Sequence, residues 1–182
     1  MSDESGASRA FILRGLVVVV LLSLVASCAL GDDAARLKPV IERIARTLGR
    51  SEDEVLSLVR RESRQTGRAL ETVASALDDA ARQTGSVQAR TQSIAARHPR
   101  IPKDKIEQFL VGAGCDVLGD AAQGETPDFR EITAKNLAGT VSPIDRILLV
   151  QDLRDLWNDM QAGAGADSLR LRLQILIRCE GL

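Results

Sequence analysis

Apolar residues recur every three or four positions through the first half of the chain, as expected of helices that bury one face. Glycines at positions 49, 67 and 85 stand 18 residues apart and close similar segments. Because glycine commonly follows the last turn of a helix, the pattern predicts short, separate helices joined by tight turns. The alternative is a longer helix that carries these glycines internally, since 18 residues make five helical turns. The periodic apolar positions are Val40, Ile44, Leu48, Val55, Leu56, Val59, Leu70, Val73, Leu77 and Ala80.

Two start signals mark helices directly. Ser51 and Glu54 form a capping box just after Gly49. Ser142 followed by Pro143 combines an N-cap residue with a proline at the first helical position, which indicates the start of a helix. We expect this helix to belong to the core of the second half, because its apolar face is broad. That face carries Leu149, Leu153, Leu156 and Met160.

The other segments of the second half are predicted from weaker signals. Asp104 is expected to cap a helix, residues 119–128 to form a loop, and residues 129–137 to form a short helix. Between residues 167 and 178 apolar and polar residues alternate, which is typical of a strand, yet the leucines also fit a helix capped by Asp167. No other segment is a convincing partner strand, so we expect a helix. The helix after Asp104 has its apolar face at Ile106, Phe109, Leu110, Ala113 and Val117.

The N-terminal residues indicate where the protein is located. Residues 15–25 are uncharged, which suits the h-region of a secretory signal better than the roughly 20 residues of a membrane-spanning helix. The run ends in Val25-Ala26-Ser27-Cys28, which resembles the lipobox of bacterial lipoproteins. The resemblance implies cleavage before Cys28 and acylation of that residue, and so attachment to a membrane, the outer one if the host has two. An uncleaved anchor helix and an ordinary cleaved signal are the alternatives.

Two cysteines, Cys115 and Cys179, follow the predicted cleavage point. An even pair in an exported protein indicates a disulfide, with two free thiols as the alternative. We therefore predict an all-α protein in which short helices of about 18-residue period precede a disulfide-tied helical bundle. The predicted order is a signal peptide at 1–27, a helical repeat region at 28–98, a basic linker with prolines at 99–105 and a C-terminal helical domain at 106–182.

Composition narrows the chemistry. The chain has 24 Lys and Arg against 25 Asp and Glu, which excludes a strongly basic nucleic-acid-binding protein or an acidic-tail protein as the class of the whole chain. Aromatic residues make up 2% and there is one His, so few side chains are suited to stacking, metal binding or acid–base catalysis. The sequence has no glycine-rich phosphate loop, nucleophile elbow or metal-spaced Cys/His set. We predict no enzymatic activity, no cofactor and no metal site.

Residues 44–58 resemble a DNA-binding helix-turn-helix, because Ala45, Gly49 and Val55 have that family's spacing. The resemblance implies that Leu48 and Leu58 pack the two helices together and that nearby arginines contact phosphates. Two features argue against this interpretation. The segment follows an export signal, and its second helix begins with three acidic residues that would repel phosphate. Any tight helix–glycine–helix corner shares this geometry. The arginines in question are Arg50, Arg60, Arg61 and Arg64.

Other charged groups are weaker candidates. Residues 90–105 are basic, which suits contact with anionic lipid head groups or cell-wall polymers, with a solvated linker as the alternative. Three carboxylates on one helix face, at positions 152, 155 and 159, are expected to face solvent, because a hard cation needs oxygens from several directions. His98 is expected at the surface. The basic contact residues would be Arg97, Arg100, Lys103 and Lys105, and an acidic group without EF-hand spacing consists of Asp116, Asp120, Glu125 and Asp128.

These patterns together favour binding over catalysis. We predict a lipid-anchored helical protein of the bacterial cell envelope that faces the periplasm or the exterior and contacts another envelope protein. Three other classes stay open, and the first is a membrane-anchored helix-turn-helix protein that binds DNA. Phage spanin subunits are similar in outline, with an anchored N-terminus, a helical body and a Cys near the end; an immunity or inhibitor lipoprotein would protect an envelope enzyme. The predicted contact face consists of Leu56, Arg60, Arg61 and Arg64.

Overall fold

The structure is a computed structural model that describes residues 36–83, 85–137, 141–162 and 165–181. All regular secondary structure in these residues is helical, which confirms the predicted all-α class. The chain divides into residues 1–39 and a compact unit of residues 40–182. The predicted signal peptide and Cys28 lie outside the described residues.

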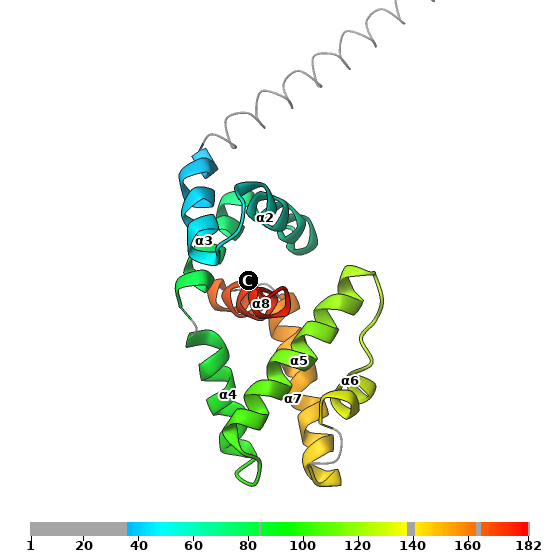
Figure 1. Cartoon of the computed structure of the whole chain (residues 1–182). Helices are drawn as coiled ribbons and strands as arrows, with labels where there is room; N and C mark the ends of the chain where they lie inside the picture. The colour runs from blue at the N-terminus through cyan, green and yellow to red at the C-terminus, as the bar shows by residue number, and fades with distance from the viewer. Residues whose placement is uncertain (1–35, 84, 138–140, 163–164, 182) are drawn as a thin grey trace, which may run out of the picture. The chain divides into compact units, whose positions relative to one another are not determined.

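The first half forms separate helices, as predicted (Figure 1). After a helix over residues 36–48, Gly49 and Gly67 adopt φ of 67° and 66°, the left-handed conformation that glycine accepts at the end of a helix. The third glycine was wrongly predicted as a cap, because Gly85 instead opens a helix and Gln83 ends the one before it. The helices are α2 (Glu52–Thr66), α3 (Leu70–Arg82) and α4 (Gly85–Arg97).

The second half contains α5 (Lys103–Ala122), α6 (Phe129–Asn136), α7 (Pro143–Ala162) and α8 (Ala166–Cys179). Three local predictions about this half were wrong. Helix α5 runs through Gly119, so the loop before α6 begins only at Gln123. Asp104 and Asp167 cap nothing, because each lies inside the first turn of its helix, where a carboxylate still interacts favourably with the exposed N–H groups.

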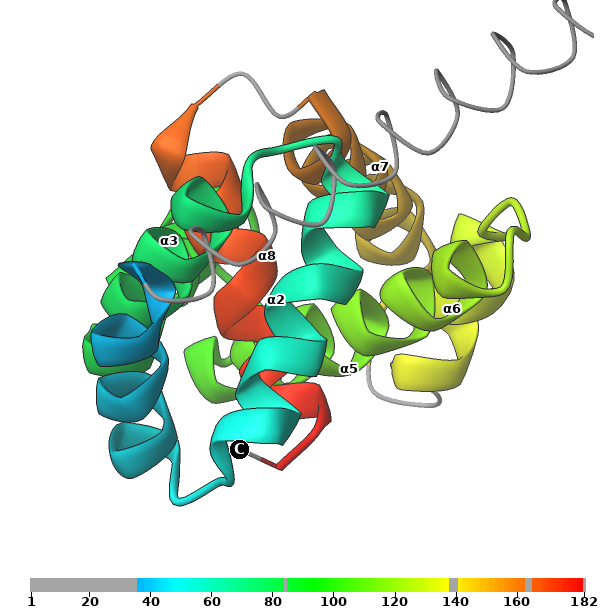
Figure 2. The ribbon, with the colours of Figure 1, turned by 90° about the horizontal axis from the view of Figure 1, so that it is seen from above.

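Helix α8 is the centre of the compact unit. Helices α3, α4, α5 and α7 all pack on it, and it runs through the middle of the ribbon in Figure 2. Every residue from Leu171 to Ile177 is buried. Because apolar neighbours surround this helix on several sides, its leucines and isoleucines need not follow a single stripe. That burial explains the alternating pattern in this segment. The helix prediction is confirmed and the strand alternative is wrong.

Buried polar groups in α8 have partners on other helices. The Oε1 atom of Gln174 accepts a hydrogen bond from the backbone N–H of Val87 at 3.0 Å, and its Nε2 donates to the carbonyl of Gln83. Arg172 Nε lies 2.7 Å from Glu62 Oε2 and its Nη2 lies 2.8 Å from Gln65 Oε1. These contacts tie α8 to α2 and to the first turn of α4, whose N–H groups would otherwise be unsatisfied.

The predicted disulfide joins Cys115 in α5 to Cys179 at the end of α8, with a Cα–Cα distance of 5.5 Å. Next to it, Gly114 allows the two helices to approach closely, because a Cβ atom there would stand 2.9 Å from Ile175 Cγ2. Residues 99–105, predicted as a linker, form the turn from α4 into the start of α5 and lie within the compact unit. Within the described residues, no helix is both long and apolar enough to cross a membrane.

Candidate functional site

The turn between α4 and α5 carries a buried histidine. His98 is 1% exposed, and its Nε2 lies 2.8 Å from Asp152 Oδ2 while its Nδ1 lies 3.4 Å from Asp145 Oδ1. The prediction of a surface histidine is therefore wrong. The turn folds against α7, and two carboxylates of that helix enclose the imidazole. Because this ring is closed off from solvent and contacts both carboxylates, the cluster fastens the turn to α7.

Asp152 is the centre of this cluster. Its side chain is 8% exposed and also accepts a hydrogen bond from Arg97, so it does not lie on a solvent face as predicted. Asp155 and Asp159 are exposed, in agreement with that prediction. Arg97, a predicted anionic-surface contact, is thus engaged by its own chain although half of its side chain remains exposed. Nearby, burial and the charge of Arg97 lower the pKa of Arg90.

The start of α7 is held by a reciprocal cap. The Ser142 hydroxyl donates to Asp145 Oδ2 at 2.6 Å and accepts from the backbone N–H of Asp145 at 3.1 Å. The hydrogen bond from Ser142 lowers the pKa of Asp145, and the contact with His98 lowers it further. The Asp145 carboxylate is therefore ionised at neutral pH, and in this form it contacts the His98 imidazole.

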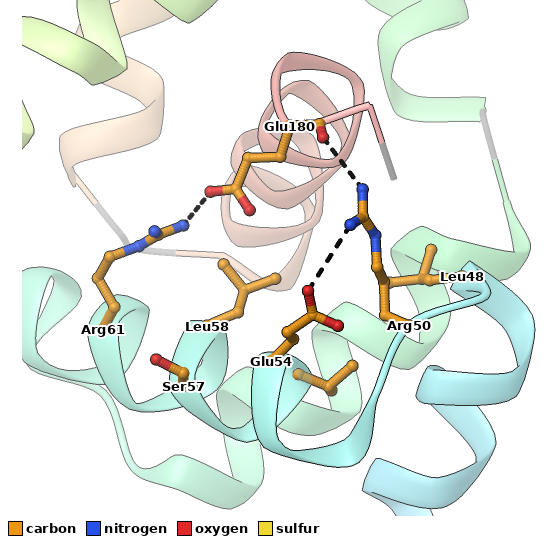
Figure 3. A pocket seen from close by; sticks show the side chains of 8 residues that line it. Leu48, Arg50, Glu54, Ser57, Leu58, Arg61 and Glu180 are labelled. Atoms are coloured by element: carbon orange, nitrogen blue, oxygen red, sulfur yellow. Dashed lines mark hydrogen bonds and ion pairs between the residues drawn. The ribbon is translucent and has the colours of Figure 1, made fainter.

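A pocket of about 240 Å³ lies between α2 and the C-terminal end of α8 (Figure 3). Apolar side chains from α2 and from the helix before it line part of its wall. Charged side chains from α2, from the corner before it and from the residue after α8 line most of the rest. This combination suits an amphipathic side chain of a binding partner better than a free ion. The lining residues are Leu48, Arg50, Glu54, Val55, Ser57, Leu58, Arg61 and Glu180.

The charges around the pocket neutralise one another. Arg61 pairs with the Glu180 carboxylate, and Arg50 lies 3.7 Å from Glu54. Arg50 also donates hydrogen bonds to the backbone carbonyls of Glu180 and Gly181 at 3.4 and 3.5 Å. A positive charge at this position interacts favourably with the C-terminal end of α8. Hydrogen bonds from Ser51 lower the pKa of Glu54. The pocket therefore has a polarised rim with little net charge.

Of the four predicted contact residues, one lines the pocket and three lie outside it. Arg61 lines the pocket, whereas Arg60 and Arg64 stand exposed on α2 and Leu56 is half-buried outside the lining set. Two of the four arginines assigned to phosphate by the helix-turn-helix resemblance, Arg50 and Arg61, are engaged by the chain's own acidic groups. The corner itself is a helix–glycine–helix turn with Val55 and Leu58 buried.

Two members of the acidic group around the loop after α5 serve the fold. Asp116 binds Lys135 at 2.8 Å and Asn136 at 2.9 Å, and Asp128 caps α6 through the N–H groups of Arg130 and Glu131. Among the residues that the structure describes, no group of three or more His, Cys, Asp or Glu side chains is placed to hold a metal ion.

One exposed surface was missed by the sequence reasoning. Ile144, Ile147 and Leu148 are 72%, 70% and 48% exposed on the first turns of α7. Their spacing of three and four residues is visible in the sequence and could have indicated a second apolar stripe beside the buried one that begins at Leu149.

Comparison with known protein families, with curated proteins and with solved structures finds no match to this chain. Its function is therefore inferred from the residues and the geometry described above.

Proposed function

We propose that this chain is a lipid-anchored helical binding module of the bacterial cell envelope and that it contacts another envelope protein. In this proposal residues 1–27 direct export and Cys28 carries the lipid after cleavage. The remaining chain then faces the periplasm or the exterior, on the outer membrane if the host has two. Several acyl chains would hold it firmly, because each buried CH₂ contributes about 0.8 kcal/mol.

The observation that carries this proposal is the bond between Cys115 and Cys179. Disulfides persist in oxidising compartments and are rare in the reducing cytosol. Both cysteines belong to the part of the chain that follows the signal segment, and they are 64 residues apart in sequence. Their pairing supports export of the folded unit and agrees with the lipobox resemblance around Cys28.

The binding role is supported by the pocket between α2 and α8. Protein interfaces concentrate their energy in a few apolar or arginine side chains that fill a pocket, surrounded by a polar rim. Here apolar wall residues lie beside the ion pair of Arg61 with Glu180, and the exposed Arg60 and Arg64 continue the surface along α2. We therefore place the partner contact at this pocket and the adjoining face of α2.

The lipid anchor is tested by replacing Cys28 with serine. The wild-type chain is expected to begin at residue 28 and to carry added acyl mass, because the lipobox cysteine is both the cleavage point and the acylation site. The Cys28→Ser chain should lose both features. Intact mass spectrometry and membrane partitioning measure this, and Ser27→Ala is the matched control, since a small residue is kept there. Wild-type and variant chains that both retain residues 1–27 and stay in the membrane would establish an anchor helix instead.

The partner contact is tested by a photoreactive amino acid at Ser57, an exposed pocket residue. We expect a discrete crosslinked species in intact cells, because the partner's anchor side chain would lie within reach of this position. The same amino acid at Gln88, exposed on α4, serves as the control and should give no such species. Gel mobility and mass spectrometry of the adduct provide the readout. Identical adducts at both positions, or none at Ser57, would argue against the pocket.

A further inference from the structure

The exposed stripe on α7 is unusual for a helix packed in a compact unit. Ile144 and Ile147 keep more than two thirds of their surface in water, and Leu148 about half. Ile147 and Leu148 each stand about one helical turn from Ile144, so the three side chains share one side of α7. Contiguous exposed aliphatic side chains mark a contact surface. The pocket between α2 and α8 is lined by other residues, so this stripe is a separate feature.

Basic side chains lie at the same end of the unit as the stripe. The contact of His98 with Asp145 brings the α4–α5 turn against the first turn of α7 (Figure 1). This turn carries the exposed Arg100 and Lys103, neither of which forms an ion pair with any residue of the chain that the structure describes. Lys105, in the first turn of α5, is also exposed, and its Nζ donates a hydrogen bond to Gln108 Oε1 at 3.3 Å.

Acidic groups at this end do not cancel the basic ones. Asp152 is paired with Arg97, and the Asp145 carboxylate, which contacts Ser142 and His98, also interacts electrostatically with Arg100. Asp145 and one further acidic residue therefore stand against the three basic residues Arg100, Lys103 and Lys105. Asp104 is the exposed acidic side chain among the basic residues of the turn. The surface next to the stripe therefore carries net positive charge.

We propose that this end of the unit rests on an anionic lipid bilayer, with Ile144, Ile147 and Leu148 inserted at the interface and the basic turn against the head groups. An apolar stripe flanked by Lys and Arg is the pattern that binds such interfaces. The stripe protrudes from α7, and a fluid bilayer accommodates protruding side chains without a preformed groove, which favours lipid over a protein surface. This contact goes beyond the lipid anchor, because it orients the folded unit on the membrane.

The insertion is tested with tryptophan fluorescence in the full chain. Trp157 is the single tryptophan, so Ile147→Trp in a Trp157→Phe background places one reporter in the stripe. Asn158→Trp in the same background is the matched control, since position 158 is exposed on the same helix. Each chain is purified from membranes and reconstituted into vesicles of phosphatidylglycerol and phosphatidylcholine with brominated acyl chains. We expect the reporter at 147 to lose most of its emission and the one at 158 to keep it.

The basic turn is tested by removing two charges. Losing one Lys or Arg near an anionic surface is expected to lower the ratio of inserted to detached protein by about fivefold. The double variant Arg100→Gln, Lys103→Gln should therefore lower this ratio roughly 25-fold. Arg46→Gln with Arg68→Gln removes the same charge from two positions outside the basic turn and outside the partner contact, and should leave the quenching at 147 unchanged. Vesicles of phosphatidylcholine alone should quench position 147 much less.

Several outcomes would overturn the proposal. Equal quenching at 147 and 158, or equal quenching at 147 in neutral and anionic vesicles, would exclude an oriented anionic contact. Emission at 147 that no vesicle changes would leave a protein as the occupant of the stripe. The reconstituted chain is held in the vesicle either by an acylated Cys28 or by an uncleaved anchor helix. The quenching at 147 therefore does not depend on which of the two is present, and acylation of Cys28 is determined separately from the intact mass.

Discussion

Replacing Arg172 with methionine is expected to lower the free energy of unfolding by about 3–5 kcal/mol. The Arg172 and Glu62 side chains are 5% and 1% exposed, and their Nε and Oε2 atoms are 2.7 Å apart. Without the guanidinium, the Glu62 carboxylate stays buried, and Arg61, at 3.7 Å, is the ion-pair partner left to it among the described residues. Because the desolvation of this charge is then uncompensated, we expect the melting temperature to fall by roughly 10 °C.

The same helix provides a control for this substitution. Arg178 pairs with Glu107 at 2.7 Å, but their side chains are 29% and 37% exposed, so Arg178→Met is expected to cost less than about 1 kcal/mol. A chain with both Arg172→Met and Glu62→Leu should recover most of the loss, because no buried charge remains. Urea unfolding followed by circular dichroism measures all of these chains. Equal losses for Arg172→Met and Arg178→Met would contradict the role given to the buried pair.

Two-residue start signals predicted helix starts correctly in this chain, whereas the single aspartates Asp104 and Asp167 did not. The capping box of Ser51 with Glu54 and the Ser142–Pro143 start are both confirmed, because each depends on residues within one helical turn. Glycine signals were less reliable. Gly67 ends α2 as predicted, whereas Gly119 is accommodated inside α5, where a glycine costs only about 1 kcal/mol relative to alanine.

Burial of polar side chains could not be predicted, because it depends on distant partners. His98 is enclosed by carboxylates 47 and 54 residues further along the chain, and nothing in its own polar segment indicates them. Arg172 and Gln174 likewise alternate with leucines as solvent-facing residues would. They are buried because α8 is central, and Glu62 binds Arg172 from 110 residues away.

The candidate site was predictable only in part. Arg61 was named as part of the predicted contact face, but its partner Glu180 is 119 residues away and lines the other side of the pocket. The basic residues of the α4–α5 turn were recognised from charge alone. They lie at the same end of the unit as the exposed Ile144 and Ile147 because the turn folds onto α7. Neither segment's own sequence pattern predicts that contact.

Removing the disulfide is expected to destabilise the compact unit by about 4 kcal/mol in the chain-entropy model, within a typical range of about 2–5 kcal/mol. The bond between Cys115 and Cys179 closes a loop across 64 positions of sequence, and its loss restores conformational freedom to the unfolded chain. Denaturant unfolding with and without a reductant measures the effect. The Cys115→Ala, Cys179→Ala chain should match the reduced wild type and should not respond to reductant. An unfolding midpoint that reductant leaves unchanged in the wild type would contradict the prediction.

Reduction should also change the pocket, because the disulfide lies next to its outer wall. Cys179 precedes Glu180, whose carboxylate pairs with Arg61 and whose carbonyl accepts from Arg50. Once the end of α8 is free to fray, these contacts are made for only part of the time. Arg61→Ala should therefore lower the free energy of unfolding less in the reduced chain than in the oxidised one. Crosslinking from Ser57 should also weaken on reduction, while the control at Gln88 stays unchanged. Equal effects of Arg61→Ala in both redox forms would show that α8 keeps its end in place without the bond.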